Sequence, residues 1–295
     1  MKVRISIAVA LVALLALGAV ALTGCGSSAS TTSSTGSTSA SAPADNGQIT
    51  IAGSDTMVNM AQAWAEAYGN ANPDAAISVK GGGSGNGIAS LINKSVMIAD
   101  SSRAIKPEEI TQAQANGVNP VTTKVARDGV VIIVNTANKL TDVTKDQLAK
   151  VYSGTITNWK DLGGADAPIV LLGRDSSSGT YSFIQDEVLG KTLLYAKSMR
   201  SLQSNQAIVD EVGKNPNAIG YVGLGYDKGA IKALTVGKVA ASVATVLDGT
   251  YPLSRDLNMI SNGEPTGSAK AYIDWILGAD GQSIVASQGF VPLKQ

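Results

Sequence analysis

Histidine is absent from this chain of 295 residues, and cysteine occurs once, at Cys25. A Ser-His-Asp triad and a Cys-His nucleophile pair are therefore excluded, because both need an imidazole base. Zinc sites built on histidine or on several cysteines are excluded as well. Carboxylate-only chemistry and Ser-Lys dyads remain open, so the composition narrows the enzyme classes without removing all of them.

Aromatic residues are also scarce, at 4%, whereas 44% of the residues are hydrophobic and 32 are glycine. A core built mainly from small aliphatic side chains, with many glycines, suits an α/β protein with tight strand-to-helix turns. The length is sufficient for two modest domains. The formal charge is zero, with 23 basic and 23 acidic residues. Because there is no basic excess and no basic run, we do not expect nucleic acid as a partner.

The N-terminal segment has the features of a secretory signal: a short basic start followed by an apolar run over residues 5–22. The run is close to membrane-spanning length, so an uncleaved anchor helix is one alternative, and secretion without an anchor is the other. Residues 22–25, Leu-Thr-Gly-Cys, resemble the lipobox of bacterial lipoproteins. In that family the signal peptide is cut before the cysteine, whose thiol is then lipidated. The resemblance implies a signal peptide over residues 1–24, a lipid on Cys25 and an extracytoplasmic, lipid-anchored location.

Residues 26–47 are almost all Ser, Thr, Gly and Ala. Such a segment cannot bury enough apolar surface to offset its ordering entropy, so we predict a flexible tether over residues 25–47, beginning at the lipidated cysteine.

From residue 48 onward, short apolar runs alternate with segments of helical periodicity, which predicts a parallel or mixed sheet. Strands are expected at residues 49–52, 76–79, 96–99, 130–134, 169–172 and 218–222. Helices are expected at residues 57–69 and 88–93, from residue 106, from about residue 181, and at residues 268–287.

Three segments share one layout, in which a strand leads through a small-residue loop into a helix: Gly53–Thr56, Gly81–Gly87 and Ser176–Thr180. Helix N-termini carry unpaired N–H groups and a partial positive charge, and serine and threonine add hydroxyl donors. Arg174 precedes the third loop and can contact an oxyanion through two N–H groups. Each loop alone is equally well a helix cap, a turn or solvated surface. Their recurrence favours an anion-binding site, although none has the spacing of a nucleotide-binding loop.

Five motifs occur in the order found in one protein family. They are Ala52–Thr56 (AGSDT), Gly82–Gly87 (GGSGNG), Tyr152–Trp159 (YSGTITNW), Arg174–Thr180 (RDSSSGT) and Ala218–Val222 (AIGYV). From about Ile49 to its C-terminus, the chain resembles the phosphate-binding proteins of bacterial high-affinity phosphate ABC importers.

This resemblance implies an α/β fold of the two-lobed periplasmic-binding-protein type (class II), with a hinge of two crossovers. Lobe I is expected to comprise residues 48–127 and 250–295, and lobe II residues 128–249. Ligand binds between the lobes, which close around it. The implied function is extracytoplasmic capture of inorganic phosphate by a monomer and its delivery to the transmembrane subunits of an ABC importer. No cofactor and no catalysis are implied.

The resemblance also implies the residues that bind phosphate. They are Ser54, Thr56, Met57 through its backbone N–H, Ser84, Ser102, Arg103, Arg174, Ser178, Gly179 and Thr180.

One position departs from the family pattern. Many members carry an aspartate after the third strand, where it accepts a hydrogen bond from protonated phosphate and rejects sulfate; here Ser102 occupies that position. Asp100 takes over this role if the loop is shifted, and Arg103 either contacts the ligand or forms a surface ion pair. Because serine hydroxyls both donate and accept, phosphate is the favoured ligand.

Three other functions stay open from the sequence. The first is binding of sulfate, molybdate or tungstate, which the serine at position 102 motivates. The second is phosphate sensing without transport. The third is an enzyme such as a phosphatase or a serine hydrolase acting through Ser178, against which the absence of histidine argues.

Overall fold

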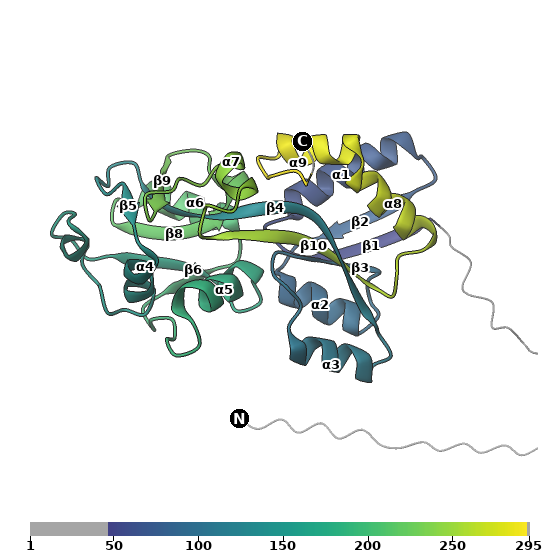
Figure 1. Cartoon of the computed structure of the whole chain (residues 1–295), viewed down its shortest axis with the longest axis horizontal. Helices are drawn as coiled ribbons and strands as arrows, with labels where there is room; N and C mark the ends of the chain where they lie inside the picture. The colour runs from purple at the N-terminus through teal and green to yellow at the C-terminus, as the bar shows by residue number, and fades with distance from the viewer. Residues whose placement is uncertain (1–46, 294–295) are drawn as a thin grey trace, which may run out of the picture. The chain divides into compact units, whose positions relative to one another are not determined.

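One sheet of ten strands runs through residues 47–293, the part of the chain that the computed structural model describes. Its order is β2-β1-β3-β10-β4-β8-β6-β7, with β9 beside β4 and β5 beside β9. The two ends of the sheet belong to two lobes, which the long strands β4 and β10 join (Figure 1). The predicted signal peptide, the lipid on Cys25 and the tether up to residue 46 lie outside the described residues. None of the helices within residues 47–293 has the length and apolar character needed to cross a membrane.

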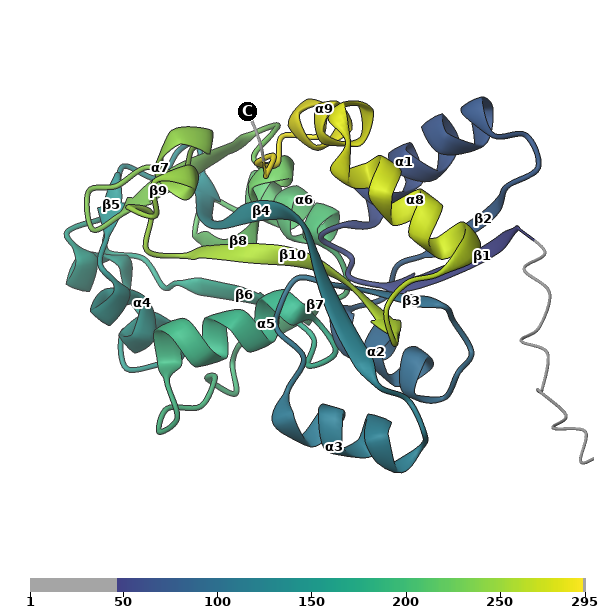
Figure 2. The same ribbon diagram turned by 45° about the vertical axis from the view of Figure 1, so that its right-hand side comes forward.

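Lobe I is built from three parallel strands with helices on both faces. The strands are β1 (Gln48–Gly53), β2 (Ala76–Lys80) and β3 (Ile98–Ser101). The helices of one face are α1 (Val58–Ala71), α8 (Gly267–Leu277) and α9 (Ala279–Ser287). The opposite face carries α2 (Ser84–Ile92) and α3 (Pro107–Ala115), as Figure 2 shows. This arrangement buries the apolar stripe of α1, including Met60 and Trp64, against the sheet.

Lobe II continues the sheet with five shorter strands. They are β5 (Asp142–Val143), β6 (Val170–Arg174), β7 (Arg200–Leu202), β8 (Ala218–Gly223) and β9 (Ile231–Val236). Its α-helices are α4 (Lys145–Tyr152), α5 (Gly179–Ile184), α6 (Asn205–Lys214) and α7 (Val243–Leu247). Shorter turns of helix are η1 (Trp159–Leu162), the π-helical η2 (Gln185–Leu189) and η3 (Leu224–Tyr226).

The two crossovers are β4 (Pro120–Asn135) and β10 (Ser254–Asn262). The first half of β4 pairs antiparallel with β10, and its second half pairs with β8 and β9. The predicted α/β fold with two lobes and a two-crossover hinge is therefore confirmed. The lobe boundaries expected at residues 127/128 and 249/250 stay a prediction, because β4 is continuous across the first of them.

The apolar run of β4 is covered on both faces, as its composition predicts. Val131 and Ile133 face the core that α1 and α6 cover, whereas Val130, Ile132 and Val134 face the core under α4 and α7. All five side chains are fully buried.

Three predicted elements have different bounds in the structure. The helix expected at residues 88–93 begins at Ser84, because Gly82 and Gly83 already make the turn with φ angles of 121° and 105°. The strand expected at residues 96–99 lies at Ile98–Ser101. The single helix expected at residues 268–287 is two helices, α8 and α9, because Gly278 adopts an extended backbone conformation between them.

Candidate anion-binding site

Three loops, each leading from a strand into a helix, meet between the lobes. The first joins β1 to α1 and the second joins β2 to α2, both in lobe I, whereas the third joins β6 to α5 in lobe II. Gly85 N donates to Ser177 O over 2.9 Å, and Ser177 Oγ donates to Gly82 O over 3.2 Å. Because the second and third loops are hydrogen-bonded across the lobes, the structure is a closed form.

Two threonine hydroxyls face each other where the first and third loops meet. Thr56 Oγ1 and Thr180 Oγ1 lie 3.0 Å apart, and both side chains are buried. The two residues come from different lobes, so their contact exists only when the lobes are closed. We call this pair the threonine side of the site.

Two serine hydroxyls form a second group. Ser84 Oγ lies 3.3 Å from Ser102 Oγ and accepts a hydrogen bond from Ser102 N over 3.0 Å. Gly179 of lobe II lies directly against them, since a β-carbon at this position would be 2.3 Å from Ser84 Oγ and 2.6 Å from Ser102 Oγ. Only glycine lets the start of α5 approach so closely. We call these three residues the serine side of the site.

The remaining predicted residues of the first and third loops differ in how their polar atoms are used. Ser178 Oγ accepts from Thr180 N and Tyr181 N over 3.2 and 3.3 Å, so it caps α5. Ser54 Oγ is buried and has no hydrogen-bond partner among residues 47–293. Met57 N donates to Ser54 O over 3.2 Å, so the N–H expected to bind the ligand takes part in a turn here.

Arg174 is almost fully buried and links the lobes. Its Nη2 lies 3.2 Å from Asp55 Oδ2 of lobe I, and Nη2 and Nε donate to the carbonyl oxygens of Gln203 and Leu202. Asn205 holds the same Asp55 oxygen through two N–H donors, at 2.8 and 2.6 Å. Arg174 Nη1 is buried without a partner in the described part of the chain, so one cationic donor remains for a ligand.

Arg103 forms an ion pair, which is mostly buried and not at the surface as expected; its contact with a ligand stays a prediction. It forms two hydrogen bonds with Glu109, from Nη1 to Oε2 over 2.7 Å and from Nη2 to Oε1 over 2.6 Å. Burial raises the pKa of Glu109, but the hydrogen bonds from Arg103 and from Lys106 N, together with the charge of Arg103, lower it overall. Nevertheless, Arg103 Nε is buried with no hydrogen-bond partner within residues 47–293. The ion pair with Glu109 therefore fixes the guanidinium of Arg103 and leaves its Nε–H without a partner in the described part of the chain.

The structure separates Ser102 from Asp100. Only Ser102 meets Ser84, whereas the Asp100 side chain is buried near Tyr272 of α8, the helix on the other face of the sheet. Burial raises the pKa of Asp100 from 3.8 to about 8, so this carboxyl is protonated at neutral pH. The position of the missing aspartate is thus filled by a hydroxyl.

Sequence reasoning missed an ion pair in the hinge. Arg255 of β10 is directly opposite Asp128 of β4, and its Nε and Nη2 donate to Asp128 Oδ2 over 2.9 and 2.7 Å. Both side chains are buried. Burial raises the pKa of Asp128 and lowers that of Arg255, and their mutual attraction opposes both shifts. A charged residue two positions before the apolar run at residues 130–134 was the available signal for Asp128; no such signal marked Arg255.

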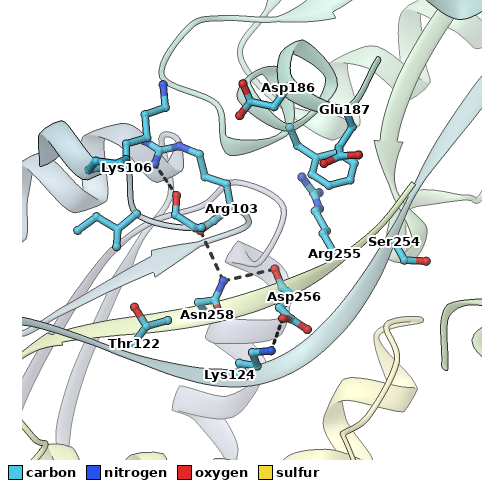
Figure 3. Close-up of a pocket in the computed structure, with 14 residues that line it drawn as sticks. Arg103, Lys106, Thr122, Lys124, Asp186, Glu187, Ser254, Arg255, Asp256 and Asn258 are labelled. Carbon is cyan, nitrogen blue, oxygen red and sulfur yellow. Dashed lines mark hydrogen bonds and ion pairs between the residues drawn. The ribbon is translucent and has the colours of Figure 1, made fainter. Parts of the chain in front are cut away.

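A cavity of about 540 Å³ lies beside these groups, between α3, the hinge strands and the segment that follows α5. Figure 3 shows Arg103 and Arg255 extending into it from the lobe I loop and from β10. Lys106, Lys124, Asp186, Glu187 and Asp256 also line it. The wall of this cavity thus carries charges of both signs.

The chemistry available at the loops is that of hydrogen-bond donation to an anion. Four hydroxyls and the unpartnered nitrogens of Arg103 and Arg174 are donors from both lobes. Within residues 47–293, no three His, Cys, Asp or Glu side chains are grouped as metal ligands would be. The arrangement suits a small oxyanion whose oxygens point in several directions.

Comparisons with known proteins agree with this geometry. Residues 35–280 match the family model of the PBP superfamily domain. The phosphate-binding protein PstS of Borreliella burgdorferi is 34% identical over 257 residues, which is 83% of this chain and 90% of the relative. PstS of Bacillus subtilis is 35% identical over 253 residues, covering 84% of this chain and 81% of the relative.

A solved structure from Clostridium perfringens, assigned as a phosphate ABC transporter substrate-binding protein and containing bound phosphate, has 34% identity and a TM-score of 0.78. The match covers 84% of this chain and 100% of that one. An ABC-type phosphate transport receptor from Vibrio cholerae has a TM-score of 0.69 at 29% identity, over 82% of this chain and 99% of that one. The chain therefore belongs to the PBP superfamily and, within it, to the family of phosphate-binding proteins of bacterial phosphate ABC importers.

Proposed function

We propose that this protein captures inorganic phosphate between its two lobes outside the cytoplasm and delivers it to the transmembrane subunits of an ABC importer. The observation that carries the proposal is the meeting of donors from both lobes at one buried place. Thr56, Ser84 and Ser102 come from lobe I, and Gly179 and Thr180 come from lobe II. Such a site is complete only in the closed form, so a ligand that bridges the donors stabilises closure.

Both cationic and neutral hydrogen-bond donors hold the anion. The unpartnered Nη1 of Arg174 and Nε of Arg103 supply charge-assisted hydrogen bonds, which are stronger than those between neutral groups. Arg103 is held by Glu109 within lobe I, so little of its side-chain entropy is lost on binding. Arg174 is held by Asp55 across the lobes, so this pair forms as the lobes close. In the closed form the two carboxylates offset the charge of the two guanidinium groups.

Phosphate is favoured over sulfate by the serine side of the site. Near neutral pH phosphate carries at least one proton and needs an acceptor for it, which sulfate does not. Ser84 and Ser102 each retain lone pairs and a rotatable hydroxyl hydrogen, so one of them can accept while the other donates. Because these hydroxyls can also both donate, a sulfate-binding protein is the second candidate function.

The protein is further proposed to act without catalysis. Ser178, the candidate nucleophile of an esterase, uses its oxygen to cap α5. The chain has no histidine to activate it. The relatives identified above carry the names of binding proteins and of a transport receptor.

Anchoring through Cys25 completes the proposal. The lipobox-like sequence at residues 22–25 and the Ser/Thr-rich residues that follow support a lipid-tethered monomer whose folded part can reach its importer. Metabolic labelling with a radioactive fatty acid tests the anchor, because Cys25→Ser is expected to abolish the label and release the protein from the membrane.

Calorimetric titration with phosphate, and then with sulfate, tests the ligand. The protein is produced without residues 1–24 and with Cys25→Ser, and it is stripped of ligand by unfolding and refolding. We expect micromolar or tighter phosphate binding near neutral pH and no sulfate signal. Sulfate binding equal to or tighter than phosphate binding would leave the fold in place and replace the ligand. Binding of neither anion would overturn the proposed function.

A further inference from the structure

The hinge ion pair reaches the ligand site. Besides Asp128, the guanidinium of Arg255 contacts the threonine side: Nη1 donates to Thr180 Oγ1 over 3.0 Å, and Nη2 lies 3.4 Å from Thr56 Oγ1. These partners belong to the hinge, to lobe II and to lobe I. Arg255 is thus the side chain in which all three parts of the closed molecule meet.

We propose that Arg255, held by Asp128 at the hinge, contacts the oxygens of Thr56 and Thr180 so that the hydroxyl hydrogen of Thr180 points to the ligand, and thereby couples phosphate binding to lobe closure. This inference rests on the proposed function and adds a positioning residue to its site.

The donors around each threonine oxygen determine the direction of its hydroxyl hydrogen. A threonine oxygen has two lone pairs and one hydrogen. The oxygen of Thr56 is approached by N–H donors from Arg255 and Asn205, both at 3.4 Å, so its own hydrogen points to Thr180. The oxygen of Thr180 then accepts from both Thr56 and Arg255. The hydrogen of Thr180 consequently has no acceptor among the described residues and is available to an anion.

Contacts on two sides fix the orientation of the Arg255 guanidinium. Asp128 Oδ2 accepts hydrogen bonds from both Nε and Nη2 of Arg255, and Asp128 Oδ1 accepts one from Leu224 N over 2.9 Å. The ring of Phe183 lies 5.4 Å from the guanidinium carbon. With a carboxylate on one edge and a ring at its face, the guanidinium has a fixed plane. Its Nη1 edge therefore points to the threonine side.

Closure of the lobes brings the two threonines to Arg255. Thr56 and Thr180 lie on different lobes, and opening of the cleft separates them, whereas Arg255 and Asp128 remain paired along the two hinge strands. In an open form Arg255 can stay hydrogen-bonded to at most one of the two threonines. Because the pair with Asp128 has no net charge, the contribution of Arg255 comes from its directed N–H groups and not from added positive charge.

A double-mutant cycle tests the proposal by measuring phosphate affinity for Arg255→Gln, Thr180→Val and the combined variant. We expect each single variant to bind phosphate about 10- to 100-fold more weakly. If Arg255 acts through Thr180, the double variant loses much less than the product of the two single losses. Lobe closure on phosphate addition, followed by small-angle scattering, should be reduced in Arg255→Gln.

The matched control is Arg127→Gln. Arg127 is adjacent to Asp128 on the same hinge strand, but its side chain is 41% exposed and lies 3.8 Å from Asp256. Its replacement should change phosphate affinity by less than about 2-fold. Arg255→Lys keeps the charge but cannot contact Asp128 and both threonines together, so about a 5- to 10-fold loss is expected. This variant replaces Arg255→Gln in the cycle if the latter does not fold.

The outcomes separate the inference from the function on which it rests. Unchanged phosphate affinity in Arg255→Gln, or losses that simply multiply in the double variant, would overturn the role of Arg255 and leave phosphate capture in place. Failure of the unmodified protein to bind phosphate would overturn both.

Discussion

The threonine and serine sides of the anion site offer similar hydroxyl groups in different surroundings. Thr56 and Thr180 are approached by the N–H groups of Arg255 and Asn205, which occupy their lone pairs. Ser84 Oγ accepts one backbone N–H, from Ser102, and the two serine hydroxyls otherwise contact each other, with either of them able to donate. The threonine hydroxyls are therefore committed to donation, whereas the serine hydroxyls can turn between donation and acceptance. The contrast teaches that neighbouring donors, and not the hydroxyl itself, decide what a site recognises.

Gly179→Ala should have the largest effect on phosphate affinity. It disrupts the serine side of the site and leaves the threonine side unchanged. The added methyl group would lie 2.3 Å from Ser84 Oγ, so either the serines shift or the lobes stay apart. We expect phosphate affinity to fall by about 1,000-fold, with little change in the melting temperature of the ligand-free protein. Titration calorimetry measures the affinity.

The control for this change is Gly69→Ala, because nothing lies within 4 Å of a β-carbon at that position of α1. It should bind phosphate normally and gain roughly 0.5 to 1 kcal/mol of stability. Normal phosphate binding by Gly179→Ala would show that the serine side does not hold the ligand.

Arg174→Ala removes a cation that belongs to neither the threonine side nor the serine side. Its loss should therefore weaken phosphate binding without favouring one side over the other. The variant loses the unpartnered Nη1 donor and leaves Asp55 without its cation. Phosphate affinity should fall by about 100-fold. Arg200→Ala, in which an exposed pair with Glu211 is lost, is the matched control and should bind normally. An Arg174→Ala protein that keeps its affinity would remove Arg174 from the site.

Ser102→Asp sharpens the comparison by turning the serine side into a fixed acceptor. A carboxylate beside Ser84 accepts the proton of phosphate but repels an anion without one. Phosphate affinity should change by less than about tenfold, while any sulfate binding should fall by about 100-fold. Ser95→Asp, an added charge on the exposed end of lobe I, controls for net charge. Equal losses for both anions would contradict the assignment of the serine side as the selectivity element.

Asp100→Asn should leave both sides intact and alter only stability. The folded protein keeps a proton on Asp100 up to about pH 8, whereas the unfolded chain loses it above 3.8, so stability falls as pH rises between these values. The variant should be more stable than the parent by roughly 1 to 3 kcal/mol at about pH 9, and similar at about pH 4. Denaturant unfolding across this range checks the difference.

Asp274→Asn, at an exposed carboxylate paired with Lys270, should not reproduce that pH dependence. Phosphate affinity should stay within about 2-fold in both variants, because Asp100 does not lie with Ser84 and Ser102. A parent protein whose stability is flat from about pH 4 to 9 would show that Asp100 is charged when folded.

The loops were predictable because each depends on local sequence. A strand, a run of small residues and a helix follow one another along the chain, and this order places Thr56, Ser84 and Thr180 between the end of a strand and the first turn of a helix. The start of α2 was misplaced because the glycines at residues 81–83 complete the turn earlier than helical periodicity alone indicates.

The contacts that hold the site were not predictable, because they join residues far apart in the chain. Asp128 meets Arg255 through the register of β4 against β10, and Asp55 meets Asn205 across the cleft. Local periodicity determines neither the register of two strands nor the closure of the two lobes. The break at Gly278 was missed for a similar reason, since it depends on how closely α9 packs on α8; a β-carbon on Gly281 would lie 2.3 Å from Ile276 O.

The placement of β10 in the sheet has a consequence for the order of folding. This strand lies between β3 and β4, yet it is made of residues 254–262, near the end of the chain. Synthesis must therefore deliver almost the whole polypeptide before the lobe I sheet can be joined to the rest, and α8 and α9 follow later still. Lobe II, built from one continuous stretch, faces no such delay. The lobe that contains the first strand of the chain thus also needs its last strand before it is complete.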